Sequence, residues 1–132
     1  MKEMEYSFNL LNRTEILDEG NYKGWNYVIV SYGMHPCAYI EIPKGHRFYE
    51  KDYEEIDLDC HGGLTFSAER DFGFGEKYYI GWDYAHGGDY IGARLFPSFN
   101  EYAGGTDKRW ATAEILDEVR EVIEQIVGGE NV

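Results

Sequence analysis

The strongest strand signal in this chain comes from two segments, Tyr27-Val-Ile-Val-Ser-Tyr32 and Cys37-Ala-Tyr-Ile-Glu-Ile42. Both are rich in aromatic and β-branched residues, a composition typical of buried strands. Only the short Gly33-Met-His-Pro36 connection separates them, so together they predict an antiparallel hairpin. We expect its first strand to cover Gly24–Tyr32 and its second strand to cover Pro36–Ile42.

Further strands are predicted on both sides of this hairpin. Glu5–Leu10 precedes it, and Ile56–Ser67 and Lys77–Asp83 follow it, each with strand-forming residues. Glycines and charges in Glu69–Gly75 predict an exposed turn between the last two strands. The segment Arg47–Ile56 has poor periodicity and predicts at most a helical turn.

The C-terminal part of the chain predicts one amphipathic helix over Thr112–Val127. Thr112 is the expected N-cap, and Gly128-Gly129 is the expected stop. A glycine-rich segment, Ala85–Gly105, precedes the helix and predicts a long loop. The helix carries one apolar stripe, formed by Ile115, Leu116, Val119, Val122, Ile123, Ile126 and Val127.

These elements predict a single α+β domain over residues 1–132. Its small, mainly antiparallel β-sheet would be covered on one face by the C-terminal amphipathic helix, with long Gly-rich loops. A chain of 132 residues has the usual length of one domain.

Composition excludes several classes of function. The net charge of −13 argues against direct nucleic-acid binding, because a DNA or RNA backbone attracts basic proteins. The sequence has no signal-peptide pattern and no apolar run of membrane-spanning length, so we expect a protein of the cytoplasm that does not bind membranes. Two cysteines are too few for a disulfide scaffold.

Two motifs concentrate acids, histidines and glycines between Asp57 and Asp89. They are Asp57-Leu-Asp-Cys-His-Gly-Gly63 and Trp82-Asp-Tyr-Ala-His-Gly-Gly-Asp89, and each places a histidine directly before a Gly-Gly pair. Both lie at the ends of predicted strands, so we expect them to converge on a small polar ligand. The predicted ligand-binding residues are Asp59, His61, Gly62, Gly63, Thr65, Ser67, Trp82, Asp83, Tyr84, His86 and Asp89.

The residue types in these motifs also fit catalysis. Imidazole and carboxylate groups bind divalent metals, and an imidazole beside a carboxylate suits acid-base chemistry. His61, Asp83 and His86 are therefore candidate catalytic residues, and the same three with Asp89 are candidate ligands of a divalent metal cofactor. The spacing matches no known metal motif, so the cofactor is left open.

A structural role is the alternative for the same residues. His61 and His86 would then be partly buried, with their ring nitrogens bonded to neighbouring groups, and the Gly-Gly pairs would only allow turns. Trp82 and Tyr84 would pack in the core rather than stack on a planar ligand. Cys60 would be a small buried residue, unless the fold paired it with His86.

Three segments resemble a family of small proteins encoded in bacteriophage and prophage genomes. They are Pro43-Lys-Gly-His-Arg-Phe-Tyr49, Asp59-Cys-His-Gly-Gly-Leu-Thr-Phe-Ser67 and Gly81-Trp-Asp-Tyr-Ala-His-Gly-Gly-Asp89. The resemblance covers about Ala38 to the C-terminal helix, although members of the family often have cysteine at the position of Tyr84. It implies an accessory phage protein in the host cytoplasm, of the kind that counters host defence by sequestering or cleaving nucleotide-derived signals.

Three functions follow from these observations. The first is a non-enzymatic binder of a small polar, nucleotide-derived ligand, which could also form homo-oligomers. The second is a hydrolase, such as a phosphodiesterase, that uses His61, Asp83, His86 and Asp89. The third is an inhibitor or nucleic-acid mimic that presents acidic side chains to a basic partner protein. The sequence favours binding slightly over hydrolysis.

Overall fold

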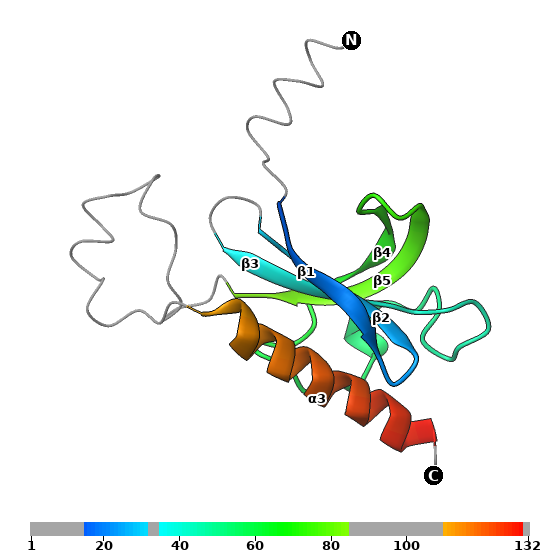
Figure 1. The fold of residues 1–132 in the computed structure, drawn as a ribbon. Helices are drawn as coiled ribbons and strands as arrows, with labels where there is room; N and C mark the ends of the chain where they lie inside the picture. The colour runs from blue at the N-terminus through cyan, green and yellow to red at the C-terminus, as the bar shows by residue number, and fades with distance from the viewer. Residues whose placement is uncertain (1–14, 32–34, 85–109, 131–132) are drawn as a thin grey trace.

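The computed structural model describes residues 15–31, 35–84 and 110–130 (Figure 1). It has a five-stranded antiparallel sheet packed against one C-terminal helix, which confirms the expected α+β class. The strands are β1 (Glu15–Tyr22), β2 (Trp25–Ser31), β3 (Pro36–Glu41), β4 (Phe66–Asp71) and β5 (Glu76–Asp83), and their order across the sheet is β1-β2-β3-β5-β4. The expected strand Glu5–Leu10 and the loop Ala85–Gly105 lie outside the described residues.

The predicted central hairpin is confirmed. β2 and β3 pair antiparallel, with Tyr27 opposite Ile40 and Val30 opposite Cys37. β3 also pairs with β5, and β5 with β4, so the buried residues of the hairpin lie in the middle of the sheet. The turn predicted within Glu69–Gly75 joins β4 to β5.

Strand β1 was not predicted from the sequence. It is joined to β2 by a two-residue turn in which Lys23 and Gly24 both have positive φ, 51° and 89°, as a type I′ turn requires. A register shift between Ile16 and Asp18 interrupts the strand. Because β1 is a largely exposed edge strand with a bulge, it lacks the apolar alternation by which buried strands are recognised.

The predicted strand Ile56–Ser67 is wrong over most of its length. Strand pairing begins only at Phe66, and the residues before it form an irregular segment beside the helix, after a short 3-10 helix at Tyr53–Glu55. The alternation was real, because Leu58 and Cys60 pack against the inner core while Asp57 is exposed. It reflects packing against the helix and does not reflect pairing with a strand.

Helix α3 (Thr112–Glu130) covers one face of the sheet, here called the inner face (Figure 1). Five residues of its predicted stripe are fully buried, whereas Leu116 and Val127 are half-buried. Glu114 accepts a hydrogen bond from the backbone N–H of Ala111, so the helix begins with half of a capping box. No helix among the described residues is long and apolar enough to cross a membrane.

Two details of the helix ends differ from expectation. Thr112, the expected N-cap, is instead the first helical residue, so the cap lies one position earlier, at Ala111. Gly128 and Gly129 do not stop the helix and are part of it. At Gly129 a Cβ atom would meet Nη2 of Arg47 at 2.8 Å, so the glycine lets this side chain lie against the helix.

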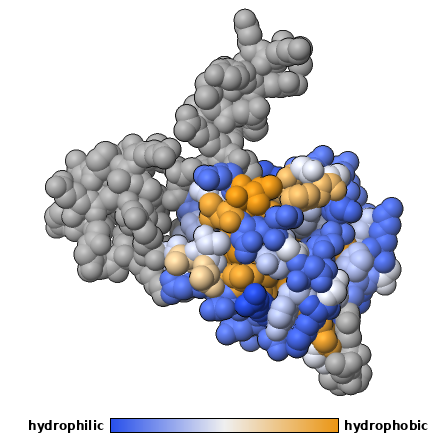
Figure 2. All heavy atoms as spheres, in the orientation of Figure 1, coloured by the Kyte–Doolittle hydropathy of each residue, from blue (hydrophilic) through white to orange (hydrophobic). Residues whose placement is uncertain are grey.

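The opposite, outer face of the sheet has a second core. It contains Val28, Val30, Cys37, Tyr39, Phe72 and Tyr79, and the β4–β5 hairpin curls over it, away from α3 (Figure 1). The ring of Tyr39 lies 4.8 Å from that of Phe72. Tyr39 also covers Gly81, where a Cβ atom would meet the Tyr39 ring at 2.5 Å. The face shown in Figure 2 is mostly hydrophilic, with separate hydrophobic patches.

Candidate functional site

Part of the two sequence motifs meets at the inner face, beside the start of α3. The imidazole ring of His61 stacks on the phenol ring of Tyr84, with centroids 4.7 Å apart and an angle of 9° between the planes. The Trp110 ring lies 4.9 Å from His61 and 5.0 Å from Tyr84. With Trp82 and Glu118, these residues form what is here called the His61 cluster.

Glu118 of α3 is the hydrogen-bonding centre of the His61 cluster. Its carboxylate accepts a hydrogen bond from the Tyr84 hydroxyl and another, 2.7 Å long, from the backbone N–H of His61. The Tyr84 hydroxyl in turn accepts a 3.1 Å hydrogen bond from Nε1 of Trp82. These bonds satisfy the polar atoms of two aromatic residues that are 0% and 1% exposed.

A second contact fixes the same loop to the helix. The side-chain amide of Gln125 donates to the backbone carbonyl of Asp59 and accepts from the Asp59 backbone N–H, both at 2.8 Å. The loop then turns at Gly62 and Gly63, whose φ values are 70° and 82°, and Gly63 N–H donates to the Cys60 carbonyl at 2.9 Å. The Gly-Gly pair therefore serves a left-handed turn at this position.

Burial favours the neutral form of two groups at the cluster, the Tyr84 hydroxyl and the Cys60 thiol. Burial, followed by the hydrogen bond to Glu118, raises the pKa of the Tyr84 hydroxyl far above its ordinary value. Burial also raises the pKa of the Cys60 thiol to about 12, with further contributions from nearby Glu118 and Asp59. A thiol of this kind stays protonated at neutral pH, which opposes its use as a nucleophile.

Other residues of the predicted ligand site make contacts outside the His61 cluster. Asp83 lies opposite Cys37 in the sheet register and accepts a 3.1 Å hydrogen bond from the Thr65 hydroxyl. The Ser67 hydroxyl accepts a 2.9 Å hydrogen bond from the backbone N–H of Tyr53, so it holds the 3-10 helix against β4. His86 and Asp89 lie outside the described residues. In the described part of the chain, no three His, Cys, Asp or Glu side chains are grouped as a metal site requires.

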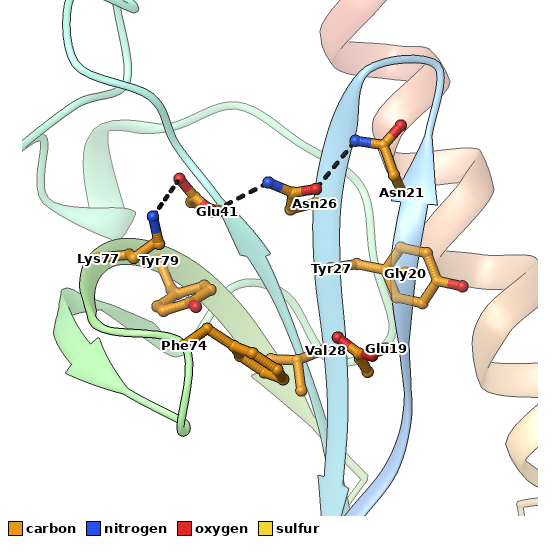
Figure 3. Close-up of a pocket in the computed structure, with 10 residues that line it drawn as sticks. All are labelled: Glu19, Gly20, Asn21, Asn26, Tyr27, Val28, Glu41, Phe74, Lys77 and Tyr79. Atoms are coloured by element: carbon orange, nitrogen blue, oxygen red, sulfur yellow. Dashed lines mark hydrogen bonds and ion pairs between the residues drawn. The ribbon is translucent and has the colours of Figure 1, made fainter.

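A pocket that sequence reasoning missed lies on the outer face (Figure 3). It has a volume of about 370 Å³, within the range of small-molecule sites. Strands β1, β2, β3 and β5 form it together with the β4–β5 turn. Its lining residues are Glu19, Gly20, Asn21, Asn26, Tyr27, Val28, Glu41, Phe74, Lys77 and Tyr79. We call it the outer-face pocket.

One wall of the outer-face pocket is a chain of polar side chains (Figure 3). Asn21 Nδ2 donates to Asn26 Oδ1 at 2.9 Å, and Asn26 Nδ2 donates to Glu41 Oε1 at 3.2 Å. The other oxygen of Glu41 lies 4.0 Å from Nζ of Lys77. The Glu41 side chain is 19% exposed and the Lys77 side chain 40% exposed, so both charged groups still reach solvent.

Apolar side chains form the other part of the pocket. Val28 and Tyr79 belong to the outer core and are 1% and 3% exposed. Phe74, at the tip of the β4–β5 turn, is 45% exposed and lies beside Val28 in Figure 3. The Tyr27 ring points away from these residues, across Gly20, so Tyr27 offers the pocket no aromatic surface.

A second hollow, of about 380 Å³, shares Glu41 and Lys77 with the outer-face pocket. It also contacts the acidic side chains of Glu69 and Glu76. Phe74 lines the first of these two hollows, whereas the second has the less exposed Tyr49 and Tyr78 in its lining.

Comparisons with protein-family models, curated proteins and solved structures give no match to this chain.

Proposed function

We propose that this protein is a non-enzymatic binder of a small polar ligand and that the ligand occupies the outer-face pocket. The proposal depends on one observation: a polar wall and the exposed ring of Phe74 line the same pocket, which has a volume of about 370 Å³. Ligand sites commonly combine apolar surface with a few convergent polar groups in this way.

The His61 cluster supports the proposal by contrast. Trp82 and Tyr84 are buried, and Glu118 already accepts hydrogen bonds from Tyr84 and from the backbone of His61. A planar ligand that stacked on either buried ring would have to displace these contacts. The geometry of the cluster therefore favours a structural role, in which it holds the Asp59–Gly63 loop on α3.

The resemblance to phage-encoded proteins supports a biological setting for such a binder. In this proposal the protein is a counter-defence factor of the host cytoplasm that sequesters a small signal and leaves it chemically intact. The alternative function is hydrolysis of the ligand by His61, Asp83, His86 and Asp89, which would convert the ligand to a product.

The test is a thermal-shift screen of small polar metabolites, followed by two tryptophan variants. Asn26→Trp fills the outer-face pocket from β2, whereas Glu15→Trp places the same side chain on β1 outside its lining. We expect stabilising ligands to bind the native protein and Glu15→Trp, and to lose at least about tenfold in affinity with Asn26→Trp. Circular dichroism checks that both variants fold.

Three results would overturn the proposal. The first is a screen with no stabilising ligand, and the second is unchanged affinity in Asn26→Trp. The third is conversion of the ligand to a product during incubation, measured by mass spectrometry, because conversion indicates the hydrolase alternative.

A further inference from the structure

This inference rests on the proposed binding function and names its ligand. We infer that the outer-face pocket binds a planar, amine-bearing heterocycle without phosphate groups, of the nucleoside class. The hydrogen-bond polarity of the pocket wall, its charge and its aromatic side each support this class.

The polarity of the wall is fixed by a backbone group. Gly24 N–H can only donate, and it donates to Asn21 Oδ1 at 3.0 Å, so Nδ2 of Asn21 must be the atom that faces Asn26. The same reasoning orients Asn26, whose Nδ2 then faces Glu41. The chain of amides therefore ends on a carboxylate, which has acceptor sites only.

An acceptor at the end of this chain selects a donor on the ligand. Each Glu41 oxygen has two lone pairs, and the contacts with Asn26 and Lys77 leave acceptor capacity for a ligand N–H. An exocyclic amine of a nucleobase supplies such a donor, whereas a carbonyl oxygen at the same position would face the carboxylate unfavourably.

Charge excludes phosphorylated forms of the same ligand. Glu19, Glu41 and Lys77 are the charged residues that line the pocket, and together they have a formal net charge of −1. The chain as a whole has a net charge of −13. A phosphate would meet one lysine already beside Glu41, in a field that repels anions.

The aromatic side suits a flat ring. Phe74 stands between Gly73 and Gly75, which have φ values of 106° and 90° and so shape the tight turn that presents it. Phe74 is 45% exposed although it lines the pocket with buried Val28 and Tyr79. A heterocycle in the pocket would cover this exposed apolar surface.

The experiment measures affinities of matched nucleosides by isothermal titration calorimetry. Adenosine and inosine differ by an exocyclic amine against a carbonyl, and the neighbouring ring nitrogen changes from an acceptor to an N–H donor. Cytidine and uridine differ in the same way, and adenosine 5′-monophosphate adds only the phosphate to adenosine. For the native protein we expect the amine member of each pair to bind about tenfold or more tightly. The monophosphate should bind more weakly than adenosine.

The variant Glu41→Gln should reverse the preference between the two members of each nucleoside pair. In Glu41→Gln the new amide oxygen still accepts from Asn26, so its NH₂ group takes the place of Oε2 beside Lys77 and offers the pocket a donor in place of an acceptor. We expect the preference to invert toward inosine and uridine. Glu15→Gln makes the same chemical change on β1 outside the pocket and should leave the preference as it is in the native protein.

The outcomes separate this inference from the proposed function. If inosine, uridine or the monophosphate binds as tightly as its partner, or if Glu41→Gln keeps the native preference, the ligand class is wrong. If no nucleoside binds but another screened ligand loses affinity in Asn26→Trp, the class is again wrong and the binding function stands. If no ligand of any class depends on Asn26, both fail.

Discussion

The His61 cluster and the outer-face pocket lie on opposite faces of one sheet, and they use polar residues in opposite ways. In the cluster, Glu118 accepts hydrogen bonds from Tyr84 and from the backbone of His61, within a buried aromatic group. In the pocket, Glu41 ends a hydrogen-bonded chain that lines open space. A dense polar motif can thus mark an internal contact, while scattered residues form an accessible site.

The first prediction uses one cysteine from each face of the sheet. Burial raises the pKa of Cys37, on the outer face, and of Cys60, in the loop of the cluster, to about 12 from an ordinary value of 9.0. At pH 8 we expect iodoacetamide to label both thiols at least about a hundredfold more slowly in the folded protein than in the urea-unfolded chain. Fast labelling of Cys60 would show that the cluster is an accessible reactive site.

The same pKa shifts give the direction of a pH dependence. Because both pKa values are raised by folding, the thiols contribute stability that is fully present below about pH 9 and is lost as the pH rises toward about 12. Urea denaturation between pH 8 and pH 11 should show a falling free energy of unfolding. A constant value across this range would contradict the buried placement.

The second prediction removes the centre of the cluster. Glu118→Ala leaves the buried hydroxyl of Tyr84 and the backbone N–H of His61 without their acceptor, so it should lower the free energy of unfolding by about 2–4 kcal/mol. Glu121→Ala, on the exposed side of α3, is the matched control and should change it by less than about 0.5 kcal/mol. If urea denaturation gives similar changes in the free energy of unfolding for both variants, Glu118 does not have this structural role.

The third prediction concerns the imidazole ring of His61, which the sequence predicts to be a ligand-binding or catalytic group. His61→Ala removes ring contacts with Tyr84 and Trp110 and should cost about 1–2 kcal/mol of stability. Ligand affinity at the outer-face pocket should not change, because His61 lies on the other face of the sheet. If the His61→Ala protein folds but no longer binds the ligand, the binding site lies at the His61 cluster and not in the outer-face pocket.

The fourth and smallest effects come from a pair of glycines. Gly63 has a φ of 82°, so Gly63→Ala should destabilise the turn by about 1 kcal/mol, although no atom lies within 4 Å of the added Cβ. Gly128 lies in α3 with equally open space, so Gly128→Ala should stabilise the protein by about 0.5–1 kcal/mol. Thermal unfolding of the two variants should give shifts of opposite sign, and shifts of the same sign would contradict these backbone roles.

The sequence predicted the parts of the fold that have a strong apolar period. The β2–β3 hairpin follows from Tyr27–Tyr32 and Cys37–Ile42, and α3 follows from its buried stripe. The β1 strand was missed because its bulge and exposure remove that period. The strand predicted at Ile56–Ser67 was wrong because its alternation reflects packing against a helix.

The outer-face pocket could not be predicted for a related reason. Asn21, Asn26, Glu41 and Lys77 belong to four strands, and only the register of the sheet brings them together. One local signal was present, since Asn21 and Asn26 flank the Lys23-Gly24 turn at paired positions. The contacts of His86 and Asp89, outside the described residues, stay predictions.

An NMR titration of the ¹⁵N-labelled protein with adenosine tests directly whether the ligand occupies the outer-face pocket. We expect the backbone amide signals of Asn26, Glu41 and Phe74 to shift with a common dissociation constant, while those of Gly62 and Gly63 stay in place. Shifts confined to Gly62, Gly63 and the rest of the His61 loop, with the outer-face signals unchanged, would contradict this placement of the ligand.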